Sequence, residues 1–161
     1  MAFWRAQTKF VRKLSVADLL IFAGVVLLIY GVVGVAEEWA SPYHPVTEID
    51  LSGWALLKYS FFSLVRVTAA YLLSLIFTFT YGYAAAKSRL AEPILIPLLD
   101  ILQSIPVLGF MPGLVLAMIH LFPHSNMGIE IAAVIMIFTG EGWNMVFSYY
   151  SSLKAVPQEL R

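Results

Sequence analysis

One carboxylate, Glu141, stands within the otherwise uncharged and largely apolar segment 131–153. At mid-membrane depth an ionised carboxylate costs about 2.5–3.5 kcal/mol, so its surroundings must offset that cost. Trp143 and Asn144 supply an indole donor and an amide nearby, and Gly140 and Gly142 give the backbone room to adapt. Two interpretations stay open. Either Glu141 and Asn144 line a polar pathway, or the carboxyl is kept neutral by a hydrogen bond between helices.

A second candidate segment carries two prolines and two glycines. Pro106 and Pro112 loosen a helix, and Gly109 and Gly113 have the spacing that lets a neighbouring helix approach closely. In lipid, a broken helix survives only where protein or water satisfies the freed carbonyl groups. We therefore expect this segment to face protein or a cavity, with plain helix packing as the alternative. The residues predicted to line a translocation path are Ser104, Gly109, Pro112, Gly113, Glu141 and Asn144.

The remaining reactive side chains do not form a recognisable catalytic or metal site. His120 and His124 have the four-residue spacing of helical metal ligands, but Pro123 interrupts the helix and favours a turn. The chain has no cysteine, and its serines have no histidine at a shared depth. None of the ten glycines precedes a lysine, so the phosphate-binding loop of an ATPase is missing. We predict no metal, no cofactor bound by this chain and no enzymatic activity of its own.

The composition places these residues in a membrane. Of the 161 residues, 60% are hydrophobic and 12% are charged, whereas soluble domains carry roughly 25% charged residues. Uncharged runs cover 19–36, 67–86 and 101–129, and each is long enough to cross a bilayer as a helix. The segment 131–153 is a fourth span, interrupted only by Glu141. The sequence therefore predicts an all-α integral membrane protein with about four transmembrane helices.

The distribution of Lys and Arg predicts the orientation of these spans. Eight of the ten lie in 1–14, 87–89 and 154–161, while the segment 37–58 carries four carboxylates. Because short cytoplasmic loops collect basic residues, both the N-terminus and the C-terminal end are expected in the cytoplasm. Arg66 and Asp100 are expected near the ends of their spans, where they reach water.

This orientation divides the chain into four predicted parts: a basic cytoplasmic tail at 1–14, a first transmembrane helix at 15–36, an acidic outer loop at 37–58 and a helical core at 59–161. A cleaved signal peptide is an alternative for the first span, and it would leave the other spans oriented as before. Lys plus Arg equals Asp plus Glu, at ten each, so no positive field attracts nucleic acid and no nucleic-acid partner is expected.

Three segments, 63–71, 87–106 and 150–161, resemble the permease subunits of type I ABC importers, in the group serving nitrate, sulfonates and taurine. The resemblance implies that the core at 59–161 is part of the type I permease fold in a prokaryotic inner membrane. It also implies that ATP and Mg²⁺ are used by a separate subunit. The implied partners are an ABC ATP-binding subunit, a second permease unit (a homodimer partner or a fused second half), a periplasmic or lipid-anchored solute-binding protein, and membrane lipid.

In such permeases a segment like 150–161 leads into the cytoplasmic loop that docks on the ATPase. The residues expected in this lead-in are Val156, Pro157, Gln158, Glu159, Leu160 and Arg161. The chain departs from the usual pattern, with Ala69, Ala70 and Ser74 in place of glycines after Arg66. The residues at 140–144 more closely resemble those of permeases in which two units are fused for anion uptake. This resemblance implies that the chain is the front part of a longer protein.

Two other functions stay open from the sequence. An ion-coupled secondary carrier would use Glu141 to take up and release a proton without any ATPase. A non-transporting assembly subunit would hold partners through small-residue helix faces and would use its basic tail at the inner leaflet.

Overall fold

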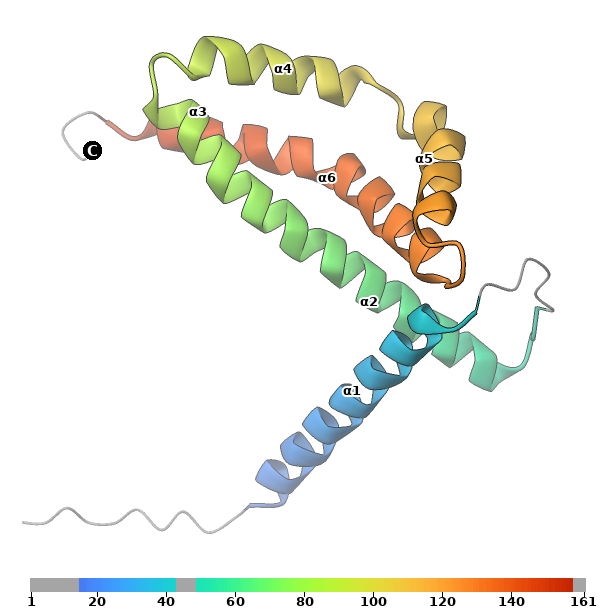
Figure 1. The fold of residues 1–161 in the computed structure, drawn as a ribbon. Helices are drawn as coiled ribbons and strands as arrows, with labels where there is room; N and C mark the ends of the chain where they lie inside the picture. The colour runs from blue at the N-terminus through green and yellow to red at the C-terminus, as the bar shows by residue number, and fades with distance from the viewer. Residues whose placement is uncertain (1–14, 43–48, 158–161) are drawn as a thin grey trace, which may run out of the picture. The chain divides into compact units, whose positions relative to one another are not determined.

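The computed structural model describes residues 15–42 and 49–157, and the regular structure of these residues is helical. The chain divides into two compact units, one through Gly34 and the other from Val35 onward (Figure 1). Of the described residues, the first unit contains most of helix α1 (Val16–Ala40), and the second contains the end of α1 and the other helices.

Helix α1 is apolar on nearly every side. The backbone N–H of Ser15 donates to the carboxylate of Asp18 at 3.0 Å, which ties down the first turn. From Val16 to Gly34 the large apolar side chains are exposed all round the helix. Such a helix is suited to lipid or to another membrane helix. It extends four residues beyond the predicted end at residue 36.

The second helix is continuous from Gly53 to Lys87 and includes one irregular turn. It consists of α2 (Gly53–Phe77), a π-helical turn η1 (Thr78–Gly82) and α3 (Tyr83–Lys87). Ser52 begins it, since its hydroxyl oxygen accepts the N–H of Ala55 at 3.2 Å. At 1.5 Å per residue the helix is about 52 Å long, well beyond the hydrocarbon thickness of a bilayer. The sequence predicted this span from the uncharged run 67–86, which covers only the second part of the helix.

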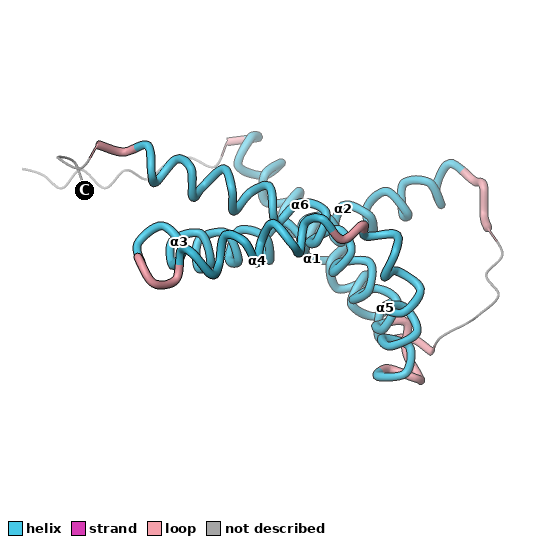
Figure 2. Tube along the Cα trace, turned by 90° about the horizontal axis from the view of Figure 1, so that it is seen from above, coloured by secondary structure: helices cyan, strands magenta, loops and turns pink. Residues whose placement is uncertain are grey.

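The third predicted span is bent. Helices α4 (Glu92–Ser104) and α5 (Val107–Leu121) meet at 87°, and Figure 2 shows them diverging from the bend. Ile105 is extended there, as steric conflict with the ring of Pro106 favours, and the Ser104 hydroxyl donates to the Ile101 carbonyl at 2.6 Å. Each helix alone, at about 20 and 22 Å, is too short to cross a bilayer.

The position of this break corrects the sequence interpretation. The sequence predicts that both Pro106 and Pro112 loosen the helix. In the structure the break lies at Ile105 and Pro106, and Gly109, Pro112 and Gly113 lie inside the continuous helix α5.

Helix α6 (Met127–Ala155) runs beside the long second helix in the same direction (Figure 1). The shared direction follows from two contacts between these helices. Arg66 pairs with Glu130, and further along both helices Gly82 lies against Tyr149, so the residue numbers rise in the same direction. The most buried side chains are small, and small residues let membrane helices approach closely. They include Ala70, Ser74, Thr78, Gly82 and Ala85 on the second helix, and Gly128, Ala132, Gly142 and Val146 on α6.

Aromatic rings fill the contact beside the π-helical turn. Phe77 packs against Tyr81, Phe138 and Trp143 with ring centroids 5.0, 5.4 and 5.6 Å away. The pairs with Phe138 and Trp143 are edge-to-face, and such pairs add about 0.5–1.5 kcal/mol beyond the area that they bury. The small residues and this ring cluster therefore form the core between α2 and α6.

Within the described residues, three helices are long and apolar enough to cross a membrane: α1, Gly53–Lys87 and α6. The bent pair α4–α5 makes a fourth if its two halves cross together. The prediction of an all-helical chain with about four spans is confirmed to this extent, as three to four candidate spans.

Candidate functional site

Four polar residues in the second half of α6 lie on one face of the helix. We call this the polar face of α6 and define it as Glu141, Asn144, Ser148 and Ser152, all of which are exposed. At 100° per residue these four positions lie within an arc of about 80°. The sequence prediction that Glu141 and Asn144 share a face of one helix fits this arrangement.

The carboxyl of Glu141 and the side-chain amide of Asn144 make no hydrogen bond or ion pair with any described residue. The two serines differ, because their hydroxyls donate within the helix. Ser148 donates to the Asn144 carbonyl at 2.9 Å and Ser152 to the Ser148 carbonyl at 2.8 Å. Trp143, considered as a donor to Glu141, instead packs against Phe77.

A carboxyl and an amide without partners are costly in lipid. Ionisable groups inside a span almost always face a bundle interior or a water-filled cavity. Gly142 and Val146 are buried on the other side of α6, where the helix packs against its own chain. In a bilayer, the polar face would need protein or water to satisfy its carboxyl and amide groups.

The other predicted path residues lie away from this face. Ser104 is exposed at the end of α4, with its hydroxyl bonded inside its own helix. Gly109, Pro112 and Gly113 lie on the exposed side of α5, and a Cβ at Gly113 would have nothing within 4 Å. Among the described residues, no hydrogen bond connects Ser104 to the polar face of α6.

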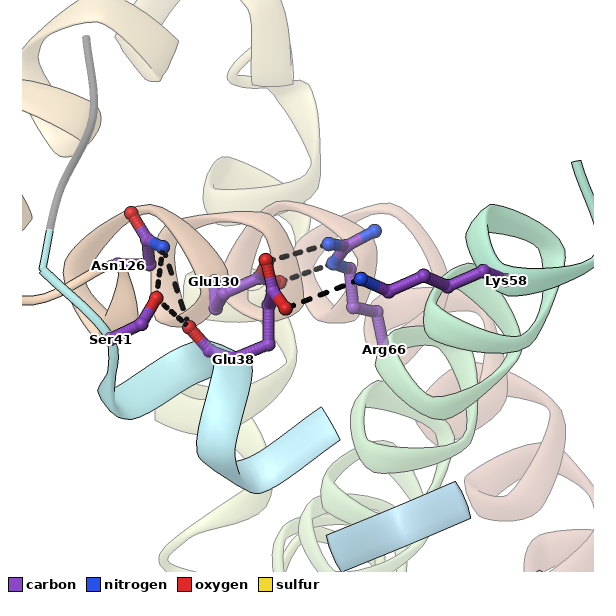
Figure 3. A network of polar contacts seen from close by, with 6 residues as sticks. All are labelled: Glu38, Ser41, Lys58, Arg66, Asn126 and Glu130. Carbon is purple, nitrogen blue, oxygen red and sulfur yellow. Dashed lines mark hydrogen bonds and ion pairs between the residues drawn. The ribbon is translucent and has the colours of Figure 1, made fainter. Parts of the chain in front are cut away.

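A second group of polar residues joins the end of α1, the first part of α2 and the start of α6, and Figure 3 shows it. We call it the Arg66 cluster. Its strongest contact is the bidentate pair of Arg66 in α2 with Glu130 in α6, in which Nη2 donates to Oε1 at 2.6 Å and Nε donates to Oε2. The two side chains are only 26% and 12% exposed. A bidentate guanidinium–carboxylate pair is among the stronger polar contacts in proteins. The members of the cluster are Glu38, Ser41, Lys58, Arg66, Asn126 and Glu130.

The other contacts of the Arg66 cluster involve residues at the end of α1. The side-chain amide of Asn126 donates to the Ser41 hydroxyl at 2.9 Å and to the Glu38 carbonyl at 3.3 Å (Figure 3). The backbone N–H of Asn126 donates to the Ser41 carbonyl at 3.0 Å. Lys58 and Glu38 form an exposed ion pair at 3.4 Å, which contributes little by itself. The cluster thus holds the residues after Gly34 to the starts of α2 and α6.

The pairing of Arg66 corrects the sequence interpretation, which placed this side chain near the end of its span in contact with water. It lies thirteen residues inside a helix that begins at Gly53. Glu130 was not singled out at all. The signal was present, because Glu130 is the lone charge between the uncharged runs 101–129 and 131–140 and therefore needs a partner.

A third group, the Glu92 cluster, holds α4 against the end of α6. The carboxylate of Glu92, at the start of α4, accepts from Lys154 Nζ at 2.6 Å and from the Tyr150 hydroxyl. Lys154 also lies 5.6 Å from the centre of the Tyr150 ring. The Lys154 and Glu92 side chains are 34% and 32% exposed, so this contact is close to solvent.

The predicted ATPase-coupling lead-in begins directly after the Glu92 cluster. Val156 and Pro157 follow the end of α6 and are exposed. The remaining predicted residues, Gln158, Glu159, Leu160 and Arg161, lie outside the described residues. The described part of the lead-in is thus accessible at the end of a helix that also carries the polar face.

The other ionisable residues considered from the sequence do not join these groups. His120 lies in the last turn of α5, and His124 lies in the turn that follows. Asp100 is exposed on α4 and accepts from the Gln103 amide at 3.1 Å. In the described part of the chain, no three His, Asp or Glu side chains gather as a metal ion would require.

Comparison of this chain with protein-family models, with curated proteins and with solved structures finds no match. Its function therefore has to be inferred from its helices and polar groups. Those that bear on function are the candidate spans, the polar face of α6 and the two ion-paired clusters.

Proposed function

We propose that this chain is a transmembrane permease subunit of an ATP-driven ABC import system. Its solute would be a small anion such as nitrate, a sulfonate or taurine. The observation that carries the proposal is the polar face of α6, where Glu141 and Asn144 have no partner in the described part of the chain, on a helix apolar enough to cross a membrane. Ionisable groups in spans commonly mark solute pathways. The resemblance of 63–71, 87–106 and 150–161 to ABC permeases supports the choice of class.

Transport by such a subunit requires that movement at the ATPase reach the pathway. Under the proposed orientation, the end of α6 at Lys154 to Pro157 faces the cytoplasm and a separate ATP-binding subunit. From Lys154 to Glu141 the helix rises about 20 Å, so a rigid α6 carries displacement directly to the polar face. The Glu92 cluster makes α4 follow that end of α6. Helices that rock as rigid bodies give alternating access, driven by the difference in ATPase binding between two states.

Anion transport sets a condition on Glu141. An ionised carboxylate on the path would repel an anion, because charges interact strongly where water is excluded. The proposal therefore requires Glu141 to be neutral or hydrogen-bonded when solute passes. We expect Glu141→Gln to leave ATPase coupling largely intact.

The direct test is reconstitution of the purified protein, with any subunit that co-purifies, into vesicles. The expected result is co-purification of a nucleotide-binding subunit and uptake of labelled nitrate, sulfonate or taurine that requires ATP on the cytoplasmic side. A non-hydrolysable ATP analogue is the control and should not support uptake. Uptake that continues without nucleotide and stops when the proton gradient is dissipated would refute the proposal.

One observation favours a second candidate, an ion-coupled secondary carrier. Glu141 has no hydrogen-bond or ion-pair partner among the described residues, so no contact within them holds its carboxyl. In a carrier of this kind, Glu141→Gln should abolish proton-coupled uptake, whereas in the ABC permease it should not. The same variant therefore separates the two functions.

The proposed orientation has its own test, because the chain contains no cysteine and single cysteines report cleanly. Leu51 is 91% exposed just before α2, and Val156 is exposed just after α6. We expect Leu51→Cys to react with an impermeant thiol reagent added outside intact cells. Val156→Cys should react only after the membrane is opened. The reverse pattern would contradict a cytoplasmic coupling segment.

A further inference from the structure

One side of α4 is apolar and exposed. Ile94, Leu98 and Ile101 lie within an arc of about 60° on this helix, and Leu90 precedes them in the turn that leads into it. We call these four residues the α4 stripe, and their exposed fractions range from 43% to 84%. Leu99, on another side of α4, is fully buried within the chain. The packing of α4 on the described residues thus leaves the α4 stripe uncovered.

Two basic residues stand directly before the α4 stripe. Lys87 ends α3, Arg89 lies in the turn that follows, and both are exposed. Arg89 makes no hydrogen bond or ion pair with the described residues. Lys87 donates one hydrogen bond, to the Tyr83 hydroxyl at 2.6 Å, and an ammonium group has three N–H groups to donate. Both cations therefore have donors to offer to an anion.

The nearest carboxylate along the chain does not neutralise these two cations. Glu92 already accepts from Lys154 at 2.6 Å and from the Tyr150 hydroxyl. With the Glu92–Lys154 pair counted as neutral, Lys87 and Arg89 leave two positive charges at the start of α4. A phosphate group is a fitting partner, because guanidinium and ammonium groups bind its oxygens through charge-assisted hydrogen bonds.

The length of the α4 stripe matches one leaflet of a bilayer. The rise from Leu90 to Ile101 is about 16 Å, and one leaflet contributes about half of the roughly 30 Å hydrocarbon core. An acyl chain of a single leaflet can therefore lie along the whole stripe while its headgroup reaches Lys87 and Arg89. Exposed apolar surface and unpaired positive charge thus adjoin in the order in which a phospholipid presents its tail and its phosphate.

We propose that Lys87, Arg89 and the α4 stripe bind an anionic phospholipid of the cytoplasmic leaflet. The phosphate lies against the two cations, and an acyl chain lies along the stripe. The two positive charges select an anionic headgroup, because the ammonium of a zwitterionic one would be repelled by them. The site goes beyond the proposed function, since it involves neither the polar face of α6 nor an ATPase. It requires only that the start of α4 face the cytoplasm, as the basic residues predict.

Quenching by brominated lipids tests the site in the full protein. The chain has no cysteine, so Ile94→Cys can carry a single small fluorophore on the α4 stripe. The vesicles are phosphatidylcholine with a rising fraction of brominated phosphatidylglycerol, compared with brominated phosphatidylcholine of the same chains. We expect phosphatidylglycerol to quench at the lower fraction. Equal quenching by the two lipids would refute selection of an anionic headgroup.

A charge variant tests the assigned cations. A basic residue near an anionic surface contributes about 1 kcal/mol, which corresponds to about fivefold in binding. Arg89→Gln should therefore lower the preference for phosphatidylglycerol about fivefold. Lys58→Gln is the matched control, because it removes the same charge at an exposed position near the start of α2 and should leave the preference unchanged. A preference unaffected by Arg89→Gln, or lowered equally by Lys58→Gln, would overturn the assignment.

Two further comparisons test the acyl chain. A fluorophore at Leu90→Cys should be quenched best by bromine near the headgroup, and one at Ile101→Cys by bromine near the end of the chain. The opposite order would contradict an acyl chain along the stripe. Glycerol phosphate in the buffer offers the phosphate without the chains and should not relieve quenching; relief would identify a site for soluble phosphate instead. These measurements need no nucleotide or solute, so their failure is distinct from a failure of ATP-dependent uptake.

Discussion

Replacing Gly128 by alanine tests the close packing of α5 on α6. A Cβ built at Gly128 lies 2.5 Å from the carbonyl oxygen of Met118 and 2.9 Å from its carbonyl carbon. Both are backbone atoms of α5, so no side-chain rotation can remove the conflict. Relief requires the two helices to separate or one of them to shift.

The size of that shift follows from the distances. Moving the Met118 oxygen from 2.5 Å to the 3.4 Å of ordinary contact requires a displacement of about 0.9 Å. Added groups in a tightly packed contact typically destabilise by about 1–3 kcal/mol. We expect Gly128→Ala to lower the free energy of unfolding by that amount.

Gly113→Ala is the matched control on the partner helix. A Cβ at Gly113 meets nothing within 4 Å, and the residue lies in the interior of α5. There alanine is favoured over glycine by up to about 1 kcal/mol through helix propensity. The same chemical change should therefore have opposite signs at the two positions.

The assay is reversible unfolding of the purified protein in mixed micelles, followed by circular dichroism as the denaturing detergent fraction rises. Gly128→Ala should unfold at a lower fraction than the parent, and Gly113→Ala at an equal or higher one. Parent-like stability of Gly128→Ala would refute the close approach of α5 to α6. An equal loss at Gly113 would show that the effect comes from glycine replacement in general.

Three further variants can be compared in the same unfolding assay. Arg66→Met leaves Glu130 unpaired in a largely buried position and should cost about 3 kcal/mol or more, while adding Glu130→Met should restore most of the loss. A double variant as unstable as the sum of the single ones would contradict this. Lys154→Ala removes a pair that is partly open to solvent and should change the unfolding free energy by less than about 1 kcal/mol; a loss like that of Arg66→Met would be the wrong result. Gly82→Ala places a Cβ 2.8 Å from a ring carbon of Tyr149, which is a movable side chain. It should destabilise by about 1 kcal/mol and be rescued by Tyr149→Leu.

The candidate spans could be predicted because uncharged runs of membrane length are conspicuous. The start of the second helix could not, because Lys58 and Arg66 interrupt the uncharged run while the helix continues through them. A charge that is paired inside the fold does not end a helix. The partner of Arg66, Glu130, is 64 residues away, and no local pattern connects them.

The bend between α4 and α5 was only partly predictable. Pro106 and Pro112 both follow apolar residues in a helical pattern, and each disfavours helix at the residue before it. The structure breaks at Pro106, where the Ser104 hydroxyl takes up a carbonyl at the end of α4. It continues through Pro112, which lies on the exposed side of α5. The local sequence does not distinguish the proline that breaks the helix from the one that does not.

The shared face of Glu141 and Asn144 could be predicted from their spacing, because three residues span most of one helical turn. Their lack of a partner could not, since it depends on which helices surround α6. The orientation of the spans and the role of 156–161 in ATPase coupling stay predictions.

The π-helical turn at Thr78–Gly82 determines which way the last turns of the second helix face. Small residues recur at every fourth position, Ala70, Ser74, Thr78 and Gly82, and on a regular α-helix each step of four advances about 40° around the axis. Three such steps would carry Gly82 about 120° away from the direction of Ala70. A π turn holds more residues than an α turn and so slows this rotation, which helps to keep Gly82 directed at Tyr149. Deleting one residue here would restore the regular winding and turn everything beyond it, through Lys87, toward a different neighbour, although every remaining side chain would be unaltered.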